Sequence, residues 1–586
     1  DVDITKQETS YAGTRKEKEN EMRKKDFIKK WTCIMLASVM AVGLAGCGGG
    51  GSKEETEHTG SESQTTGQAE TTVEAVDADV TDSWKPDENK TYQYTWCFYQ
   101  MAPIADEPEM FQFYKDNFNV EFEVWDIEAS QSSELLANRI IGGEIPDRFE
   151  VANQSILQKY VEQGIVAEIP MEMLEQYAPN VLAAIERDVP GALEYCKIDG
   201  KLYGLPSYSV NISRAPVAWR MDWLRKVGID KVPETLDEFE TAIYAMTFDD
   251  PDGNGKNDTY GLSESALTAV FGAYGYLPYV NSQGSHSGAL WQVRDGHLVN
   301  AAVQPEMKEA LERIAKWYQD GVIDPEFVTG ENQGGYWALS HSFINGRIGV
   351  SGMGQTYHWQ PALYEETSEG QNLEELHKVN PDAEVALGNP PKGPYGQGTF
   401  ANASIKEAKT VFGVQMEEEP DRLAKILSVY NWVYESKDNY NTACNGIQGV
   451  NWNYEERIGL DGEAEKAVVL SDEWKDSKVR SANFAHQAMQ LFSASFGNEK
   501  DSASIRWAKS VNADKYRYST ELFAALPSSS LYQSELNSYV EETYYSIIAG
   551  TKPVDYFDTF VETWNSMGGN VLAAEADEWY QSVQKQ

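Results

Sequence analysis

Hydrophobic and polar residues change their spacing along the chain in a regular rhythm. Residues 91–99 (TYQYTWCFY) and 120–127 (VEFEVWDI) have the pattern of strands, and 108–118 (PEMFQFYKDNF) lies between them with the period of a helix. The order returns in 132–151 (SSELLANRIIGGEIPDRFEV), where a helical segment stops at two glycines before a short strand. Strands that alternate with helices predict an α/β body with much parallel sheet.

Amphipathic helices dominate the later part of the chain. Residues 234–246, 305–321 and 421–436 carry apolar side chains at i, i+3, i+4 and i+7, which favours helices with one buried face. Thr235 precedes the first of these helices, and Glu238 follows three positions later. This spacing predicts a capping box at the start of the helix.

The N-terminal region has the pattern of a bacterial lipoprotein signal. Five Lys and Arg residues lie between positions 23 and 30, and an apolar run of 16 residues, 31–46, follows them. This run is shorter than a typical membrane-spanning helix and ends in small residues, as a signal peptide does. Residues 44–47, Leu-Ala-Gly-Cys, resemble the lipobox, which implies cleavage before Cys47 and lipidation of its thiol. The alternative is a short transmembrane anchor.

The segments around this signal have their own composition. Residues 22–46 are predicted to be the signal peptide, so residues 1–21 are interpreted as a non-native upstream extension and Met22 as the true start. Residues 47–90 are rich in Gly, Ser, Thr and Glu and poor in large apolar side chains, which predicts a disordered tether. The body then extends over residues 91–586.

Charge and cysteine content exclude several classes of function. The chain has 92 Asp and Glu against 49 Lys and Arg, a net charge of −43, which disfavours nucleic acid and anionic membrane surfaces as partners. Beyond Cys33 and Cys47, the chain has Cys97, Cys196 and Cys444, whose wide spacing fits neither a disulfide framework nor a zinc site. We interpret these three as small core residues.

Five motifs in order resemble one family over nearly all of residues 90–586. They are similar to the extracellular solute-binding proteins of bacterial ABC importers, in the group related to oligosaccharide binders. The motifs are IIGGEIPDRFEVAN (140–153), KIDGKLYGLPSY (197–208), WRMDWLRKVGIDKVPETLDEFE (219–240), QPEMKEALERIAKWYQDGVIDPEF (304–327) and GIQGVNW (446–452). Each motif alone is weak, but five in the family's order behind a lipoprotein signal are a specific combination. Residues 475–535 match no motif of this kind.

The resemblance implies a two-lobed fold like that of periplasmic binding proteins of type II, with the lobes joined by crossing strands at a hinge. The crossings are expected near Tyr208–Ser213 and Gly398–Ser404. Lobe one is then about 91–210 plus a segment after 404, and lobe two is about 211–400 plus most of the C-terminus.

The resemblance also implies that the cleft binds a solute, for which carbohydrate is the leading hypothesis. Aromatic residues make up 12% of the chain, and flat rings cover the C–H faces of sugars while amide and acid groups pair with hydroxyls. An acidic sugar would need an arginine near the crossing, such as Arg214 or Arg220. The ligand-binding candidates, carried over by motif position, are Trp96, Tyr99, Asn153, Gln154, Tyr208, Tyr357, Trp359 and Trp452. For each aromatic residue the alternative is a place in the core.

The partners implied by the resemblance are an oligosaccharide or related small solute, and separate permease and ATPase chains. The protein itself would be held at the extracellular face of the cell membrane by its lipid anchor. No catalytic residues are assigned, because the sequence contains no G-x-S-x-G, H-E-x-x-H or P-loop motif. The alternatives are a secreted glycan-degrading enzyme and a binding protein for peptides or other solutes.

Residues 249–261 (DDPDGNGKNDTYG) have the spacing of a calcium-binding loop. Oxygen ligands at EF-hand positions suit Ca²⁺, and a glycine at position 6 allows the sharp turn. Position 12 is Gly261, where a bidentate Glu is needed, and Thr259 stands where related proteins often carry an acid. The candidate ligands of a structural Ca²⁺ are Asp250, Asp252, Asn254, Lys256 through its carbonyl, and Asp258. The alternative is a metal-free Asn-Gly turn.

Overall fold

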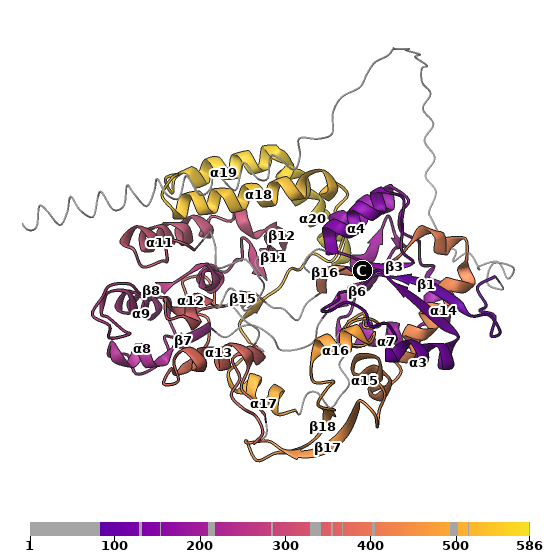
Figure 1. Ribbon diagram of the computed structural model, residues 1–586. Coiled ribbons are helices and arrows are strands. Elements are labelled where there is room, and N and C mark those ends of the chain that lie inside the picture. The colour runs from indigo at the N-terminus through magenta and orange to yellow at the C-terminus, as the bar shows by residue number, and fades with distance from the viewer. Residues whose placement is uncertain are drawn as a thin grey trace, which may run out of the picture. The chain divides into compact units, whose positions relative to one another are not determined.

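The computed structural model describes most of the body of the chain (Figure 1). The described residues are 83–127, 132–152, 154–208, 217–282, 285–327, 341–352, 356–365, 367–400, 405–492, 502–513 and 515–584. The predicted extension 1–21, the signal 22–46, Cys47 and most of the tether therefore lie outside the described residues. Trp84–Gln586 forms one compact unit.

A five-stranded mixed sheet organises the first part of this unit. Its order is β2 (Val120–Val124), β1 (Tyr92–Trp96), β3 (Arg148–Val151), β16 (Ile405–Phe412) and β6 (Leu205–Tyr208). β1 runs parallel to β2 and β3, and β16 runs antiparallel to β3 and β6. The strands expected in 91–99 and 120–127 are thus β1 and β2, and the helix expected between them is α3 (Glu109–Phe118).

Helices cover both faces of this sheet. One core gathers around Trp96, Phe122 and Tyr430, and a second gathers around Trp125, Phe149 and Leu157. The helices are α4 (Ser132–Ile141), α5 (Gln154–Glu162), α6 (Met171–Tyr177), α7 (Pro179–Asp188), α14 (Pro420–Val433), α15 (Lys437–Asn445) and α16 (Ser477–Ala482). We call the described part of 84–208 and 405–492 lobe one.

A four-stranded sheet organises the second part. Its order is β14 (Val385–Gly388), β7 (Val217–Arg220), β13 (Ile348–Ser351) and β8 (Tyr260–Leu262). Its helices are α8 (Met221–Lys226), α9 (Leu236–Phe248), α10 (Leu267–Ala273), α11 (Glu306–Asp320), α12 (His341–Ile344) and α13 (Gln371–Val379). The predicted capping box is confirmed: Thr235 Oγ1 accepts from the Glu238 N–H, and the Glu238 carboxylate accepts from the Thr235 N–H.

The C-terminal helices pack on this second part. α18 (Ser529–Ile548) lies along α11, and α20 (Asn570–Val583) covers β12 (His297–Asn300), which pairs with β11 (Trp291–Arg294). α19 (Tyr556–Trp564) lies between these two helices in the sequence and packs on α18. α17 (Ala503–Ser510) contacts the turn at Thr356–His358. We call the described part of 217–400 together with 502–584 lobe two.

The chain passes twice between the two sheets. It leaves the first sheet after β6 and enters the second at β7, and it returns between β14 and β16. Short strand β15 (Thr399–Phe400) on the return path pairs with β19 (Arg517–Tyr518). Residues 209–216 and 401–404 lie outside the described residues. These connections give the two-lobed α/β fold that the sequence predicts.

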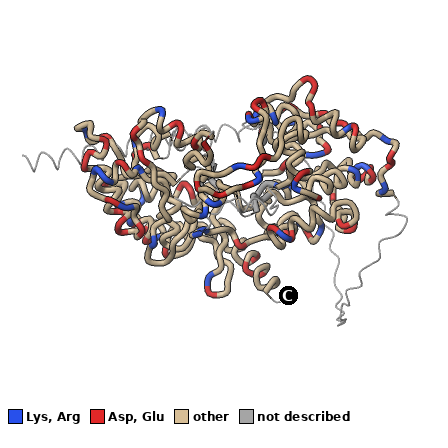
Figure 2. Tube along the Cα trace, turned by 90° about the horizontal axis from the view of Figure 1, so that it is seen from below, with Lys and Arg blue, Asp and Glu red and all other residues tan. Residues whose placement is uncertain are grey.

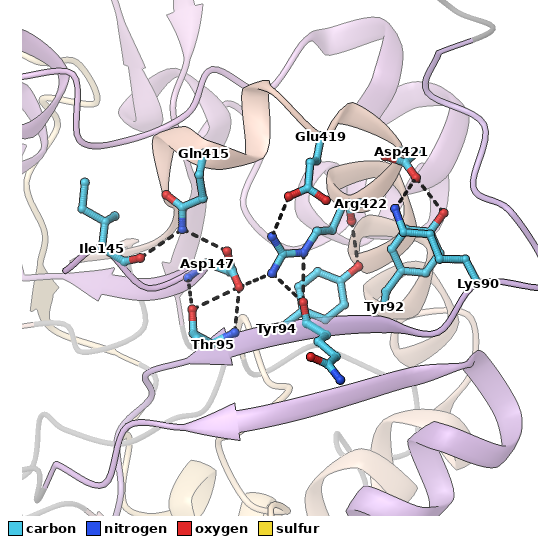
Figure 3. Close-up of polar contacts among 11 residues, drawn as sticks. Lys90, Tyr92, Tyr94, Thr95, Ile145, Asp147, Gln415, Glu419, Asp421 and Arg422 are labelled. Carbon is cyan, nitrogen blue, oxygen red and sulfur yellow. Dashed lines mark hydrogen bonds and ion pairs between the residues drawn. The ribbon is translucent and has the colours of Figure 1, made fainter. Parts of the chain in front are cut away.

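The Pro-Asp pair of the first motif has a structural role (Figure 3). Asp147 Oδ2 accepts from the Thr95 N–H at 2.7 Å and from Thr95 Oγ1 at 3.0 Å, while Oδ1 accepts from Gln415 Nε2 at 2.9 Å. Arg422 of α14 donates to the same carboxylate and also to the Gln93 carbonyl. Asp147, at the start of β3, therefore ties β1 and β3 to the helix that follows β16.

Two of the three remaining cysteines lie in the core, as predicted. Cys97 and Cys196 are buried, and burial raises the pKa of the first thiol to about 11 and of the second to about 12. Cys444 is half-buried at the end of α15.

Acidic and basic residues are interspersed along both lobes (Figure 2), and many of them form ion pairs on the surface. Within the described residues, no helix combines the length and the apolar character that crossing a membrane requires.

Candidate functional site

The carboxyl ends of β1, β2 and β3 lie at one edge of the first sheet, because these strands run parallel. Ligands of open α/β sheets bind outside such an edge. Tyr99 follows β1 there and is 41% exposed, so its ring is accessible. Asn153, which follows β3, lies outside the described residues.

Gln154 is the polar group that stands out at this edge. It is the first residue of α5 and follows β3 by three positions. Its side chain is only 9% exposed, and neither Oε1 nor Nε2 has a hydrogen-bond partner among the described residues. A buried unpaired polar group costs about 1–3 kcal/mol, so its retention calls for an explanation.

Gln158, one helical turn later, provides a contrast. It is equally buried, but its Nε2 donates to the Pro527 carbonyl at 2.9 Å and its Oε1 accepts from Ser529 Oγ at 3.0 Å. These bonds tie α5 of lobe one to the start of α18. The two glutamine side chains are thus equally buried, but only the Gln158 amide has hydrogen-bond partners among the described residues.

Two of the predicted tryptophans lie in the core. Trp96 has no exposed surface, its Nε1 donates to the Ala488 carbonyl at 2.9 Å, and its ring packs edge-on against Phe122. Trp452 is 2% exposed, and its Nε1 donates to the Gly446 carbonyl at 2.7 Å. A ring that is covered on both faces has no surface for a sugar, so we assign both residues to packing rather than to ligand contact.

The candidates Tyr357 and Trp359 of lobe two differ in how far their side chains are exposed. Tyr357 is 48% exposed, whereas Trp359 is 4% exposed and packs edge-on against Phe343 in the core around Leu376. The backbone of Tyr208 ends β6 and pairs with Ile405, and its side chain lies outside the described residues. The exposed rings among the candidates are therefore those of Tyr99 and Tyr357.

Trp125 occupies an equivalent position and also belongs to the core, because it is only 9% exposed. It directly follows β2, just as Trp96 ends β1, and the Arg139 guanidinium lies 4.6 Å from the centre of its ring. Arg139 makes this cation–π contact and is itself exposed at the surface of α4.

The arginine candidates near the crossing are less suited to a ligand. Arg220 is 2% exposed and pairs with Asp222 through two bonds, Nε to Oδ1 at 2.9 Å and Nη2 to Oδ2 at 2.7 Å. Its guanidinium also lies over the Trp223 ring. This arginine is already neutralised by a carboxylate, and Arg214 lies outside the described residues.

The predicted calcium loop folds as a tight polar turn between α9 and β8. Asp250 Oδ2 accepts from the Gly255 N–H at 3.0 Å, which closes the turn at the position-6 glycine. Gly255 has φ +75°, a left-handed conformation that glycine adopts without strain. The Asn254 amide nitrogen donates to Asp252 Oδ2 at 2.6 Å and to Asp258 Oδ1 at 3.1 Å.

The donor set of this loop fits a hard cation in part. Asp250 Oδ1 is buried and has no hydrogen-bond partner among the described residues, and the carboxylates of Asp252 and Asp258 converge on one amide group. Rotating that amide by 180° would present oxygen in place of nitrogen. In the described part of the chain, however, no three His, Cys, Asp or Glu side chains gather closely enough to be a metal site by themselves. Thr259 donates to the Met246 carbonyl and is buried, so it supplies no acid to the loop.

Comparison with known proteins gives one family match. The model of the bacterial extracellular solute-binding protein family matches residues 109–406, which include the four-stranded sheet and strands β2, β3 and β6 of the five-stranded sheet. The match spans β6, β7 and the start of β16, where the chain passes between the lobes.

Two proteins of Bacillus subtilis (strain 168) are similar over nearly their whole length. Lipoprotein LipO is 24% identical over 94% of this chain and 98% of its own. The polygalacturonan/rhamnogalacturonan-binding protein YtcQ is 23% identical over 94% of this chain and 99% of its own.

Among solved structures, the alginate-binding protein AlgQ2 without calcium ion superposes with a TM-score of 0.60. It is 17% identical, and the match covers 84% of this chain and 98% of AlgQ2. At that identity the likeness shows a shared fold.

Proposed function

The chain belongs to the family of bacterial extracellular solute-binding proteins, and we propose that it captures an oligosaccharide outside the cell and delivers it to an ABC importer. The permease and ATPase subunits of that importer would be separate chains. The observations that support the ligand class are the exposed rings of Tyr99 and Tyr357 and the buried amide of Gln154, which has no hydrogen-bond partner among the described residues. Rings cover the C–H faces of a sugar, and an amide pairs with its hydroxyls.

The relatives support the same class of ligand. YtcQ is named as a binder of polygalacturonan and rhamnogalacturonan, and AlgQ2 is named as a binder of alginate. We expect recognition by closure of the lobes, in which the ligand stabilises the closed state. Gln154, Tyr99 and Tyr357 are the residues we assign to ligand contact among those described.

A thermal-shift and calorimetry panel tests this proposal. The panel contains galacturonate, alginate, neutral fructose oligosaccharides and mixed peptides. We expect the melting temperature to rise with one class of oligosaccharide and the shift to shrink in Gln154→Ala. If only peptides raised the melting temperature, the ligand would be a peptide and not an oligosaccharide.

The rival function is a secreted glycan-degrading enzyme. The family is one of solute-binding proteins and the relative YtcQ is named as a binding protein, and we propose that this chain carries out no reaction. Incubation with the oligosaccharide that shifts the melting temperature should return that oligosaccharide intact by mass spectrometry. Release of shorter products would favour the enzyme.

We also propose that the protein is anchored at the extracellular face of the membrane through lipid on Cys47. The similarity to lipoprotein LipO supports this location. Metabolic labelling with a fatty acid should mark the native protein and leave the Cys47→Ser variant unlabelled. If the variant were still labelled, Cys47 would not be the site of lipidation.

Finally, we propose that the loop at Asp250–Asp258 binds a structural Ca²⁺, with Asp250, Asp252, Asn254, the Lys256 carbonyl and Asp258 as ligands. The buried Asp250 Oδ1, which has no hydrogen-bond partner in the described part of the chain, supports this. A ligand present at 100 times its dissociation constant stabilises by about 2.7 kcal/mol. EDTA should therefore lower the melting temperature of the parent and of Asp230→Asn, an exposed control, but not that of Asp250→Asn. If EDTA changed the melting temperatures of all three proteins equally, the proposed Ca²⁺ site would be refuted.

A further inference from the structure

The hairpin of β17 (Trp452–Ile458) and β18 (Ala464–Leu470) begins in lobe one. At its base, Tyr454 OH donates to Asp438 of α15 at 2.8 Å, and the Ser471 N–H donates to the Asn451 carbonyl. Trp474, which follows β18, is part of the core around Trp96. The base of the hairpin is therefore fixed to the first sheet and its helices.

The tip of the hairpin contacts lobe two. The Leu460 N–H donates to the Leu363 carbonyl at 2.8 Å, and Tyr364 OH donates to the Glu465 carboxylate. The Arg457 guanidinium lies 5.3 Å from the centre of the Tyr364 ring. Leu363 and Tyr364 follow Trp359, which is packed in the core of lobe two.

Helix α17 completes the socket around the tip. Arg506 binds Asp461 through two bonds, Nε to Oδ2 at 2.6 Å and Nη2 to Oδ1 at 3.0 Å, and its Nη1 lies 3.3 Å from Glu465 Oε2. Ser504 of the same helix pairs with Gln360 at 3.2 Å. We call Gln360–Tyr364 together with α17 the socket.

The hairpin has the length and stiffness to connect the lobes. Seven residue pairs run without interruption from Trp452 opposite Leu470 to Ile458 opposite Ala464. Seven residues in a strand span roughly 23 Å. In Figure 1 the hairpin runs below the lobes, from α15 and α16 toward α17 and α13.

We propose that this hairpin is a strap, and that the ion pairs at its tip limit how far the two lobes separate. The Arg506, Glu465 and Asp461 side chains are 25%, 11% and 40% exposed, so water can replace their contacts when the tip leaves the socket. The strap is a non-covalent connection, separate from the chain crossings near the hinge. It acts on the opening of the lobes whichever solute they bind, and so it goes beyond the proposed function.

Three variants of the full chain test the strap. Arg506→Gln removes the ion pairs and keeps a polar side chain. A second variant replaces residues 459–463 by Asn-Gly, a two-residue turn that closes a hairpin directly after the last pair, Ile458 and Ala464. Arg225→Gln is the matched control, because it breaks a surface ion pair with Glu384 inside lobe two.

Small-angle X-ray scattering of the ligand-free proteins provides the readout. We expect a larger radius of gyration in Arg506→Gln and in the shortened variant than in the parent, while the control superimposes on the parent. Unchanged circular dichroism and melting temperature show that the lobes remain folded. Raising the salt concentration should expand the parent toward the variants and leave the variants unchanged, because salt screens partly exposed ion pairs. The proposal is overturned if both strap variants scatter like the parent, or if salt expands all proteins alike.

Discussion

Replacing Gln154 by methionine should stabilise the ligand-free protein while weakening its binding of oligosaccharide. Methionine has a similar length, fills irregular space and carries no strongly polar group. The Gln154 amide is buried and unpaired within the described part of the chain, which costs about 1–3 kcal/mol. The variant should gain a free energy of unfolding of this size.

The expected change in melting temperature follows from the size of the body. Unfolding entropy of about 2.1 cal/mol/K per residue, over a unit that extends from Trp84 to Gln586, gives about 1 kcal/mol/K. The melting temperature should therefore rise by about 1–3 °C, which differential scanning calorimetry resolves. Binding should fall in the same variant because the amide is lost to the ligand.

Gln158→Met is the matched control on the same helix. It removes two hydrogen bonds and leaves the Pro527 carbonyl and the Ser529 hydroxyl without their partner, so it should lose about 1–3 kcal/mol. The two substitutions should thus change the free energy of unfolding in opposite directions, although the two side chains are equally buried. If Gln154→Met destabilised the protein as much as Gln158→Met does, the amide would have a partner and the reasoning would be wrong.

Three further predictions concern the stability of the lobes. Asp147→Asn should cost about 1.5–3 kcal/mol in urea unfolding, because it removes the buried carboxylate that binds Arg422 and leaves this mostly buried charge only the exposed Glu419 carboxylate; a loss below about 1 kcal/mol would contradict the role of the cluster in Figure 3. Burial and, next to it, Arg480 lower the pKa of His486 to about 4, below the ordinary value of 6.5, so the folded state resists protonation. The free energy of unfolding should fall by about 3 kcal/mol as the pH drops from 6.5 toward 4. In His486→Asn, whose side chain suits the left-handed φ of 57° at this position, the free energy of unfolding should depend less on pH over this range. If the variant and the parent had the same pH profile, His486 would not be the cause of the pH dependence. Gly272→Ala should cost about 1–3 kcal/mol, because a Cβ there would lie 1.8 Å from the Gly398 carbonyl oxygen, and a neutral result in calorimetry would show that α10 can shift.

Local patterns in the sequence were sufficient for the elements and for the family. The period-two residues of β2, the capping box at Thr235 and the order of strands and helices depend on neighbours a few positions away. The loop at Asp250–Asp258 is local in the same sense, and its turn at Gly255 closes as its spacing predicts. Whether it holds Ca²⁺ is a matter for the melting experiment with EDTA.

Exposure of the candidate ligand residues could not be derived in this way. Trp96 and Tyr99 are three positions apart, yet the first is fully buried and the second is 41% exposed. The bond from Trp96 to Ala488 spans 392 positions, and no local pattern contains it. The same limit applies to the strap, whose tip meets Tyr364 about 100 positions away and Arg506 about 40 positions away in the sequence.

Short-range periodicity and motifs in a fixed order were thus enough to predict the alternation of strands and helices, the two-lobed family fold and the position of the acidic loop. The tertiary structure decided which rings face solvent, and which of two glutamines on one turn of α5 has its amide paired. The physical reason is that burial and hydrogen-bond pairing depend on segments brought together from distant parts of the chain. Gln158 meets Pro527 and Ser529 across that distance, and Gln154 meets no partner among the described residues.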